Sequence, residues 1–222
     1  MKIWYICGVK KTDETSLQVA KLLLEIKAVK LSPDEPFRWA SGWNSPIYCD
    51  NRITLSYPKA RTYIRQQLAN LISSRLGQVD IIAGVATAGI PQGALVAEAL
   101  GLPFIYVRST AKEHGMGNQI EGLIVPDARV VLIEDLISTG SSSLKAAQAV
   151  RDAGMQVTAI VSVFTYGFPQ AAENFKAAKV AGHSLTDYAT LLQVAQENHY
   201  IESSALDKLN AWREAPERWQ AQ

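Results

Sequence analysis

Apolar residues recur at helical spacing in two stretches of the N-terminal third of the chain. Residues 13–31 carry them at positions 17, 20, 23, 24, 28 and 31, which predicts an amphipathic helix with Asp13 near its N-cap. Residues 59–76 place apolar side chains on one face and predict a second helix. The segment between them, 32–58, is rich in Pro, Gly, Trp and Tyr and therefore predicts loops and short strands.

From residue 79 onward, aliphatic runs alternate with helical patterns. We predict strands at 79–85, 102–107, 128–134 and 155–166, helices at 90–100 and 142–154, and a polar loop at 108–122. Two further helical patterns cover 186–198 and about 203–221. The strands are nearly continuous aliphatic runs, as strands covered on both faces must be. The fold class is therefore α/β, a doubly wound domain with a mostly parallel central sheet flanked by helices.

Composition agrees with a single domain in a chain of 222 residues. Hydrophobic residues make up 48% and charged residues 19%, as in ordinary globular proteins. The formal net charge of +1 gives no electrostatic case for a nucleic-acid or membrane partner, and no apolar run approaches the length of a membrane span. Two cysteines without metal or disulfide spacing favour a reducing, cytoplasmic location.

The stretch VVLIEDLISTGSSS at 130–143 carries the chemistry. Glu134 and Asp135 stand where a buried parallel strand is predicted to end, and ligands of open α/β sheets bind outside such ends. The loop after them leads to a helix N-terminus, which favours an anion. Its hydroxyl side chains can donate further hydrogen bonds: Ser138, Thr139, Ser141, Ser142 and Ser143. A phosphorylated sugar suits both the acids and the loop.

Other interpretations of the same residues stay open at this point. An acid pair at a strand end followed by a serine-rich helix cap can be purely structural. Adjacent acids also occur at this place in phospho-accepting receiver domains. A Walker phosphate loop is excluded, because the chain has no G-x-x-x-x-G-K-[ST].

Four segments together resemble the orotate phosphoribosyltransferases, which are type I phosphoribosyltransferases. VVLIEDLISTGSS (130–142) resembles the phosphoribosyl diphosphate signature, and YVRSTAKEHGMGNQIEG (106–122) the mobile catalytic loop. FRWASGWNSPIYCDNRITLSYP (37–58) is similar to the N-terminal substrate region, and GVATAGIP (84–91) to the diphosphate-binding turn. The resemblance covers about residues 17–200. It implies a parallel sheet with an N-terminal hood over the carboxyl edge of the sheet.

The implied domain has a hood at about 12–58, an α/β core at about 59–200 and a C-terminal helix at about 203–221. The implied reaction joins orotate N1 to C1′ of 5-phosphoribosyl 1-diphosphate with help from Mg²⁺. Orotidine 5′-monophosphate forms in pyrimidine synthesis, and diphosphate leaves. The resemblance implies no direct metal ligand, since Mg²⁺ is held mainly through substrate and water.

The resemblance also assigns the site residues. Catalytic roles fall to Lys112, Glu134 and Asp135, and Ser138 lies beside orotate. The residues implied to bind phosphoribosyl diphosphate are Ala88, Arg108, Lys112, His114, Glu134, Asp135, Leu136, Ile137, Ser138, Thr139, Gly140, Ser141 and Ser142.

The charges of these residues suit the reaction. Positive charge grows on the ribose ring as diphosphate leaves, and nearby carboxylates stabilise it. The departing diphosphate gathers negative charge, for which Arg108, Lys112 and His114 supply cations from one loop. A loop that closes over the site would also exclude water.

Three lysines of many orotate enzymes are absent. Ser109 stands at the position of a cation that acts in the neighbouring subunit, Ala88 before the glycine of the diphosphate turn, and Ala40 before the S-G of the substrate region. The bacterial branch that this chain resembles shares these absences, so they indicate a subtype. The resemblance further implies a two-fold homodimer in which loop 108–122 reaches the other subunit.

Two other functions remain as alternatives. A non-catalytic regulator that senses phosphoribosyl diphosphate would lack the closing loop and present a basic face. A purine phosphoribosyltransferase would stack the base on an aromatic ring after the last core strand, where Tyr166 and Phe168 stand. Four hood aromatics are expected to pack in the protein rather than stack on a base: Trp39, Trp43, Tyr48 and Tyr57.

Overall fold

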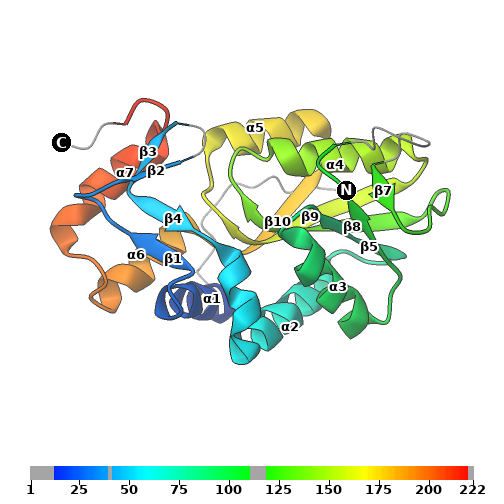
Figure 1. The fold of residues 1–222 in the computed structure, drawn as a ribbon, viewed down its shortest axis with the longest axis horizontal. Helices are drawn as coiled ribbons and strands as arrows, with labels where there is room; N and C mark the ends of the chain where they lie inside the picture. Colours follow the sequence, from blue (N-terminus) through cyan, green and yellow to red (C-terminus); the bar gives the residue numbers. More distant parts are fainter. Residues whose placement is uncertain (1–12, 40–41, 111–118, 220–222) are drawn as a thin grey trace.

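A central six-stranded sheet organises the computed structural model, which describes residues 13–39, 42–110 and 119–219 (Figure 1). The strand order is β10-β9-β8-β5-β6-β7, and every neighbouring pair is parallel except β6 and β7. The strands are β5 (Ile81–Val85), β6 (Phe104–Val107), β7 (Ile120–Glu121), β8 (Arg129–Ile137), β9 (Gln156–Thr165) and β10 (Ala181–Asp187). The predicted mostly parallel sheet is confirmed, and the predicted polar loop at 108–122 contains the short antiparallel strand β7.

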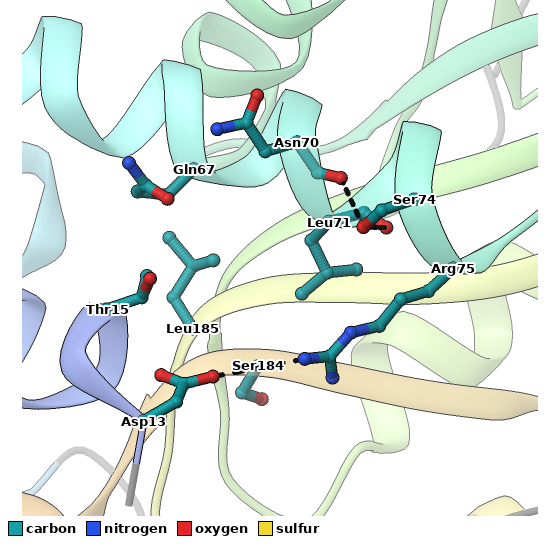
Figure 2. A pocket seen from close by; sticks show the side chains of 9 residues that line it. All are labelled: Asp13, Thr15, Gln67, Asn70, Leu71, Ser74, Arg75, Ser184 and Leu185. Atoms are coloured by element: carbon teal, nitrogen blue, oxygen red, sulfur yellow. Dashed lines mark hydrogen bonds and ion pairs between the residues drawn. The ribbon is translucent and has the colours of Figure 1, made fainter.

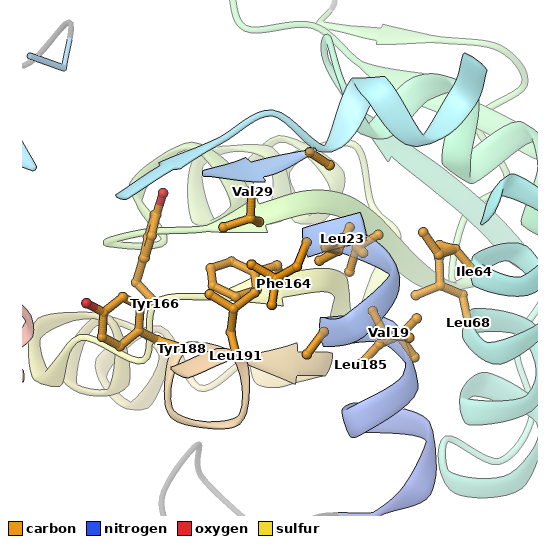
Figure 3. Packing of buried hydrophobic residues seen from close by; sticks show 14 of the residues in the cluster. Val19, Leu23, Val29, Ile64, Leu68, Phe164, Tyr166, Leu185, Tyr188 and Leu191 are labelled. Atoms are coloured by element: carbon orange, nitrogen blue, oxygen red, sulfur yellow. The ribbon is translucent and has the colours of Figure 1, made fainter. Parts of the chain in front are cut away.

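Helices cover both faces of the sheet (Figure 1). One apolar cluster joins the sheet to α1 (Glu14–Glu25), α2 (Pro58–Arg75) and α3 (Gly89–Leu100). A second cluster joins the other face to α4 (Ser141–Asp152) and α5 (Pro169–Ala178). Figure 3 shows Val19 and Leu23 of α1 and Ile64 and Leu68 of α2 in the first cluster with Phe164. The strands are aliphatic throughout because both of their faces are buried.

The short strands of the predicted hood region lie beside the C-terminal helices. Short antiparallel pairs join β1 (Val29–Leu31) to β4 (Ile47–Cys49) and β2 (Phe37–Arg38) to β3 (Asn44–Ser45), and the 3-10 helix η1 (Asn51–Ser56) follows. The C-terminal elements are α6 (Tyr188–Glu197), η2 (Ser203–Ala205) and α7 (Leu206–Glu214). Trp212 of α7 donates from Nε1 to the Asn44 carbonyl at 3.2 Å, so α7 packs against the N-terminal hood strands.

An aromatic cluster joins the hood strands to the end of β9 and to α7. Trp39 lies 5.1 Å from Tyr166 and 5.5 Å from Trp212, measured between ring centroids. Trp43 stacks on Trp39 at 6.4 Å. The expectation of packing is therefore confirmed for the two tryptophans, whereas Tyr48 and Tyr57 are 41% and 46% exposed.

The single helix predicted over residues 13–31 is wrong at its C-terminal end. Asp13 caps α1 as expected and accepts from the Ser16 backbone N–H at 2.7 Å, but the helix ends at Glu25. The backbone then reverses through Lys27, whose φ is 56°, and Val29 pairs with Cys49 of β4. Pairing between strands far apart in the sequence overrides a local helical pattern.

The C-terminal region also departs from the predictions. The helix expected at about 203–221 is shorter, since α7 ends at Glu214 and Ala215 precedes Pro216, a position that disfavours helix. The elements α5 and β10 have no counterpart in the sequence analysis. β10 reads AGHSLTD and is an edge strand without an aliphatic run, so its pattern carries little strand signal.

Candidate active site

The acid pair lies inside a strand. β8 continues to Ile137, so the predicted strand end at residue 134 is wrong. Both acids lie within the last four residues of β8. Glu134 is only 5% exposed, while Asp135 is partly exposed. The Glu134 carboxylate accepts from the Ser143 hydroxyl at 3.0 Å and from the Asp135 backbone N–H at 3.2 Å. Strand hydrogen bonding and α4 thus fix the position of Glu134.

Burial alters the protonation of both acids. It raises the pKa of Glu134 well above the ordinary carboxyl value, and the negative charge of Asp135 raises it further. The pKa of Asp135 is also raised by burial, although hydrogen bonding with Glu134 and the positive charge of Arg52 oppose that rise. Two carboxyl groups so close together favour holding one proton between them when no cation is near.

The pair stands at a switch point of the sheet. β5 and β8 are neighbours, yet α3 leaves β5 toward one face and α4 leaves β8 toward the other. A Cβ added to Gly89, the first residue of α3, would overlap the Ile133 carbonyl and lie 3.3 Å from the Glu134 Cα. Two helix N-termini therefore meet beside the acids, and helix N-termini favour anions.

The serine-rich turn leads from β8 into α4. Gly140 adopts a left-handed conformation (φ 79°) at the N-cap, with no room for a side chain beside the Phe175 ring. The Asn174 amide donates to the Thr139 carbonyl at 3.0 Å, and the Thr139 and Ser141 hydroxyls lie 3.1 Å apart. The turn thus presents the backbone N–H groups at the start of α4, as a phosphate site requires.

Not every predicted residue of this segment faces outward. Ser143 is 1% exposed and donates to Glu134, so the expectation that it serves the phosphate loop is wrong. Ile137 is fully buried, and its carbonyl accepts from the Thr165 hydroxyl and from the Tyr166 N–H. Leu136 packs against the core cluster that contains α1. Ser138, Thr139, Ser141 and Ser142 are at least partly exposed.

The diphosphate-like turn precedes α3. Ala86 donates its N–H to the Val107 carbonyl at 2.9 Å, the Ala86–Thr87 peptide bond is cis, and Ala88 stands at the N-cap of α3 without a side-chain hydrogen bond. Ala88 and Thr87 are not buried. Any anion bound at this turn would meet backbone N–H groups rather than a lysine side chain.

A hydrogen bond and an ion pair join the two ends of the predicted catalytic loop. Arg108 donates its backbone N–H to the Gln119 carbonyl at 2.8 Å, and its Nη1 lies 3.6 Å from Oε1 of Glu121. The loop therefore starts at the carboxyl end of β6, the strand next to β5. Lys112 and His114, the other predicted cations, lie outside the described residues.

A buried polar network that the sequence analysis missed ties the hood to the acids. The Asn51 amide of η1 donates to the Asp135 carbonyl at 2.7 Å, the Thr54 hydroxyl donates to the Asn51 carbonyl at 2.5 Å, and the Gln92 amide of α3 donates to Thr54 at 3.0 Å. Polar residues in the DNRIT stretch at 50–54 were the available signal. The network holds η1, α3 and β8 in one arrangement.

A surface hollow lies elsewhere. Figure 2 shows it between α1, α2 and β10, where Asp13 and Arg75 form an ion pair at 3.9 Å, and its volume is about 150 Å³. Arg75 ends α2 and the chain then enters β5, so this hollow lies toward the amino ends of the strands. It is separate from the acid pair.

The aromatic rings after β9 do not offer a base-stacking surface. Tyr166 and Phe168 are 2% and 3% exposed and stack on each other at 5.3 Å. Within the described ranges, no helix is long and apolar enough to cross a membrane, and no three His, Cys, Asp or Glu side chains are grouped to hold a metal ion.

Known proteins share this sequence and fold. The phosphoribosyl transferase domain family matches residues 57–185. An orotate phosphoribosyltransferase of Bacteroides thetaiotaomicron is 57% identical over 202 residues, covering 91% of this chain and 95% of the relative. The crystal structure of orotate phosphoribosyltransferase from Aeropyrum pernix matches with a TM-score of 0.72 and 28% identity, over 83% of this chain and 99% of that chain. The structure of Leishmania donovani UMP synthase matches with a TM-score of 0.75 and 26% identity. The match covers 89% of this chain and 42% of the UMP synthase chain. The chain thus belongs to the phosphoribosyltransferase family, and within it to the orotate phosphoribosyltransferases.

Proposed function

We propose that this protein transfers the 5-phosphoribosyl group from 5-phosphoribosyl 1-diphosphate to orotate in pyrimidine biosynthesis. The bond from C1′ to the diphosphate oxygen breaks, N1 of orotate bonds to C1′, and the N1 proton is released. The observation that carries the proposal is the acid pair between two helix N-termini, in a chain 57% identical to an orotate phosphoribosyltransferase.

In this proposal each part of the site takes one part of the sugar phosphate. The turn at 138–142 holds the 5′-phosphate, and Glu134 and Asp135 face the ribose hydroxyls. Backbone N–H groups at Ala88 and its neighbours hold the diphosphate, since no lysine stands there. Ser138 borders orotate. Leu136 and Ile137 act through their backbone and their packing, because Ile137 is fully buried.

The acids also stabilise the transition state. Positive charge that develops on the ribose ring favours the ionised forms of Glu134 and Asp135, whose pKa values burial raises in the free protein. On the leaving side, Arg108, Lys112 and His114 balance the charge that gathers on diphosphate. Single preorganised donors of this kind are worth about 10²- to 10³-fold in rate.

Mg²⁺ suits this donor set as a companion of the substrate. The partly exposed carboxylate of Asp135 stands at the carboxyl edge, and no group of three potential ligands occurs among residues 13–39, 42–110 and 119–219. A hard cation that keeps several waters and bridges substrate oxygens requires no dedicated protein cage. When bound, it would neutralise charge on the diphosphate.

The remaining parts of the proposal concern assembly and location. A two-fold homodimer in the cytoplasm, with loop 108–122 of one subunit at the site of the other, completes it. Support comes from the polar segment of twelve residues between β6 and β7 (108–119), because a connection of that length is usually functional in a compact domain.

A direct assay tests the function. Purified protein is mixed with phosphoribosyl diphosphate and either orotate, adenine or hypoxanthine, and diphosphate release is followed with Mg²⁺ and after chelation. We expect release with orotate alone, abolished by the chelator and restored by added Mg²⁺. Turnover of a purine but not orotate would contradict the substrate, and an unchanged rate after chelation would contradict the metal dependence.

A further inference from the structure

Arg52 lies in η1, the short helix that is hydrogen-bonded to the acid-bearing strand β8. It is the second residue of η1, and its neighbour Asn51 is hydrogen-bonded to the Asp135 carbonyl at 2.7 Å. The segment carrying Arg52 is therefore fixed against the carboxyl end of β8. The positive charge of Arg52 acts on Asp135 from the hood side and lowers the pKa of that carboxyl.

The guanidinium of Arg52 is held in one orientation. Its Nε donates to Oδ1 of Asp50 at 2.7 Å and its Nη2 to Oδ2 at 2.8 Å, a bidentate pair. Asp50 is itself fixed, because its Oδ1 also accepts the Arg52 backbone N–H at 3.2 Å. The Asp50 side chain is 19% exposed and that of Arg52 is 63% exposed. A guanidinium has five N–H donors, so the Nη1 group lies outside this pair and can serve a ligand.

The substrate needs a cation in this region. Orotate is uracil with a carboxylate on C6, and that carboxylate must approach a site containing Glu134 and Asp135. An unpaired anion beside other carboxylates is costly.

We propose that Arg52 is the residue that binds the carboxylate of orotate, with Asp50 as the positioning residue that aims its guanidinium. This inference rests on the proposed function and assigns the specificity for orotate over uracil to one side chain. Planar, fixed guanidinium groups are well suited to carboxylates.

A pair of product nucleotides isolates this contact. Orotidine 5′-monophosphate and uridine 5′-monophosphate differ only by the carboxylate, and their binding to the full chain is measured by calorimetry. In Arg52→Gln, affinity for orotidine 5′-monophosphate should fall roughly 10- to 100-fold, as for loss of a charge-assisted hydrogen bond. Affinity for uridine 5′-monophosphate should change less than about 2-fold, since no contact is lost.

Three variants control the result. Arg75→Gln removes an arginine of similar exposure (61%) at the far hollow and should leave both affinities unchanged. Arg52→Lys keeps the positive charge but lacks the planar, bidentate N–H donors. It should retain part of the preference for orotidine 5′-monophosphate over uridine 5′-monophosphate. The double variant Asp50→Asn, Arg52→Gln removes the carboxylate left behind, and discrimination should stay lost.

Several outcomes would overturn the assignment. Equal losses for both nucleotides, an unchanged preference in Arg52→Gln, or a loss confined to phosphoribosyl diphosphate would each place Arg52 elsewhere. Recovery of discrimination in the double variant would mean that Asp50 repelled the ligand. If the unaltered protein bound the two nucleotides equally, no carboxylate site would exist. Failure of orotate turnover in the unaltered protein is a separate result and would contradict the proposed function itself.

Discussion

At the scale of single residues, Glu134 gives the clearest pH signature. Burial and the charge of Asp135 raise its pKa, so the folded protein retains a proton that the unfolded chain loses above about pH 4.3. Protonation of Glu134 therefore favours the folded state fully below that pH. The free energy of unfolding falls as pH rises toward the folded pKa. Glu134→Gln cannot ionise and should gain stability relative to the unaltered protein between pH 5 and pH 8, by about 1.4 kcal/mol per unit of pKa shift crossed.

Thermal unfolding without substrates checks this, with melting temperatures taken at each pH unit from 5 to 8. Glu98→Gln on the exposed side of α3 gives the background for a surface glutamate. A melting-temperature difference between Glu134→Gln and the unaltered protein that stays constant with pH would show that Glu134 is ionised in the folded state throughout.

The sequence identified the residues of the signature but not the direction of each side chain. Five hydroxyl residues between 138 and 143 look alike in the sequence, yet Ser143 points inward to Glu134 while Ser141 and Ser142 stay exposed. Where α4 begins decides this, because successive helical positions turn about 100° around the axis. A helix start cannot be located to one residue from composition alone.

At the scale of elements, η1 connects the hood to the central sheet through a hydrogen bond to β8. Asn51 is 1% exposed and donates to Asp135, so Asn51→Ala leaves a carbonyl near the acids without that donor. We expect urea unfolding to show a loss of about 1–3 kcal/mol, the usual cost of a buried group left unpaired. We also expect kcat to fall, since the acid strand loses its fixed contact with the hood.

Asn70→Ala is the matched control, because Asn70 lies exposed on α2 and its side-chain Oδ1 accepts from Gln66 in the same helix. It should change stability by less than about 0.5 kcal/mol. Equal stabilities of the two variants would mean that the bond from η1 to β8 contributes nothing to the fold.

Local pattern was a good guide to elements wherever burial was continuous, as in β5, β8 and β9. It was poor where long-range pairing decided the structure. Val29–Leu31 became a strand because β4 lies beside it, and the bonds from Asn51 to Asp135 and from Gln92 to Thr54 span 84 and 38 positions. No window of neighbouring residues contains both partners of such a bond, so propensity could not reveal the network.

At the scale of the whole molecule, the position of the loop bears on the predicted homodimer. β7, which ends the loop, is the terminal strand of the sheet, and Leu123 and Val125 just after it are 75% and 41% exposed. A loop that leaves the sheet at its edge can reach a neighbouring subunit, and closed two-fold dimers are the commonest assembly. The division into hood, core and C-terminal helix remains a prediction, although Trp212 packs the last helix against Trp39 of the hood.

Mixing two inactive variants tests the shared site. Lys112→Ala damages only the loop and Asp135→Asn only the acid pair, so a mixed dimer with exchanged loops holds one intact site. An equal mixture should recover about a quarter of the unaltered activity, because half of the dimers are mixed and each has one complete site of two. Subunit exchange is verified by mass spectrometry of differently tagged chains, and either variant mixed with itself is the control. If exchanged dimers stay inactive, each loop serves its own subunit, and Ser109 then marks the loss of the contact between subunits rather than its replacement by Lys112.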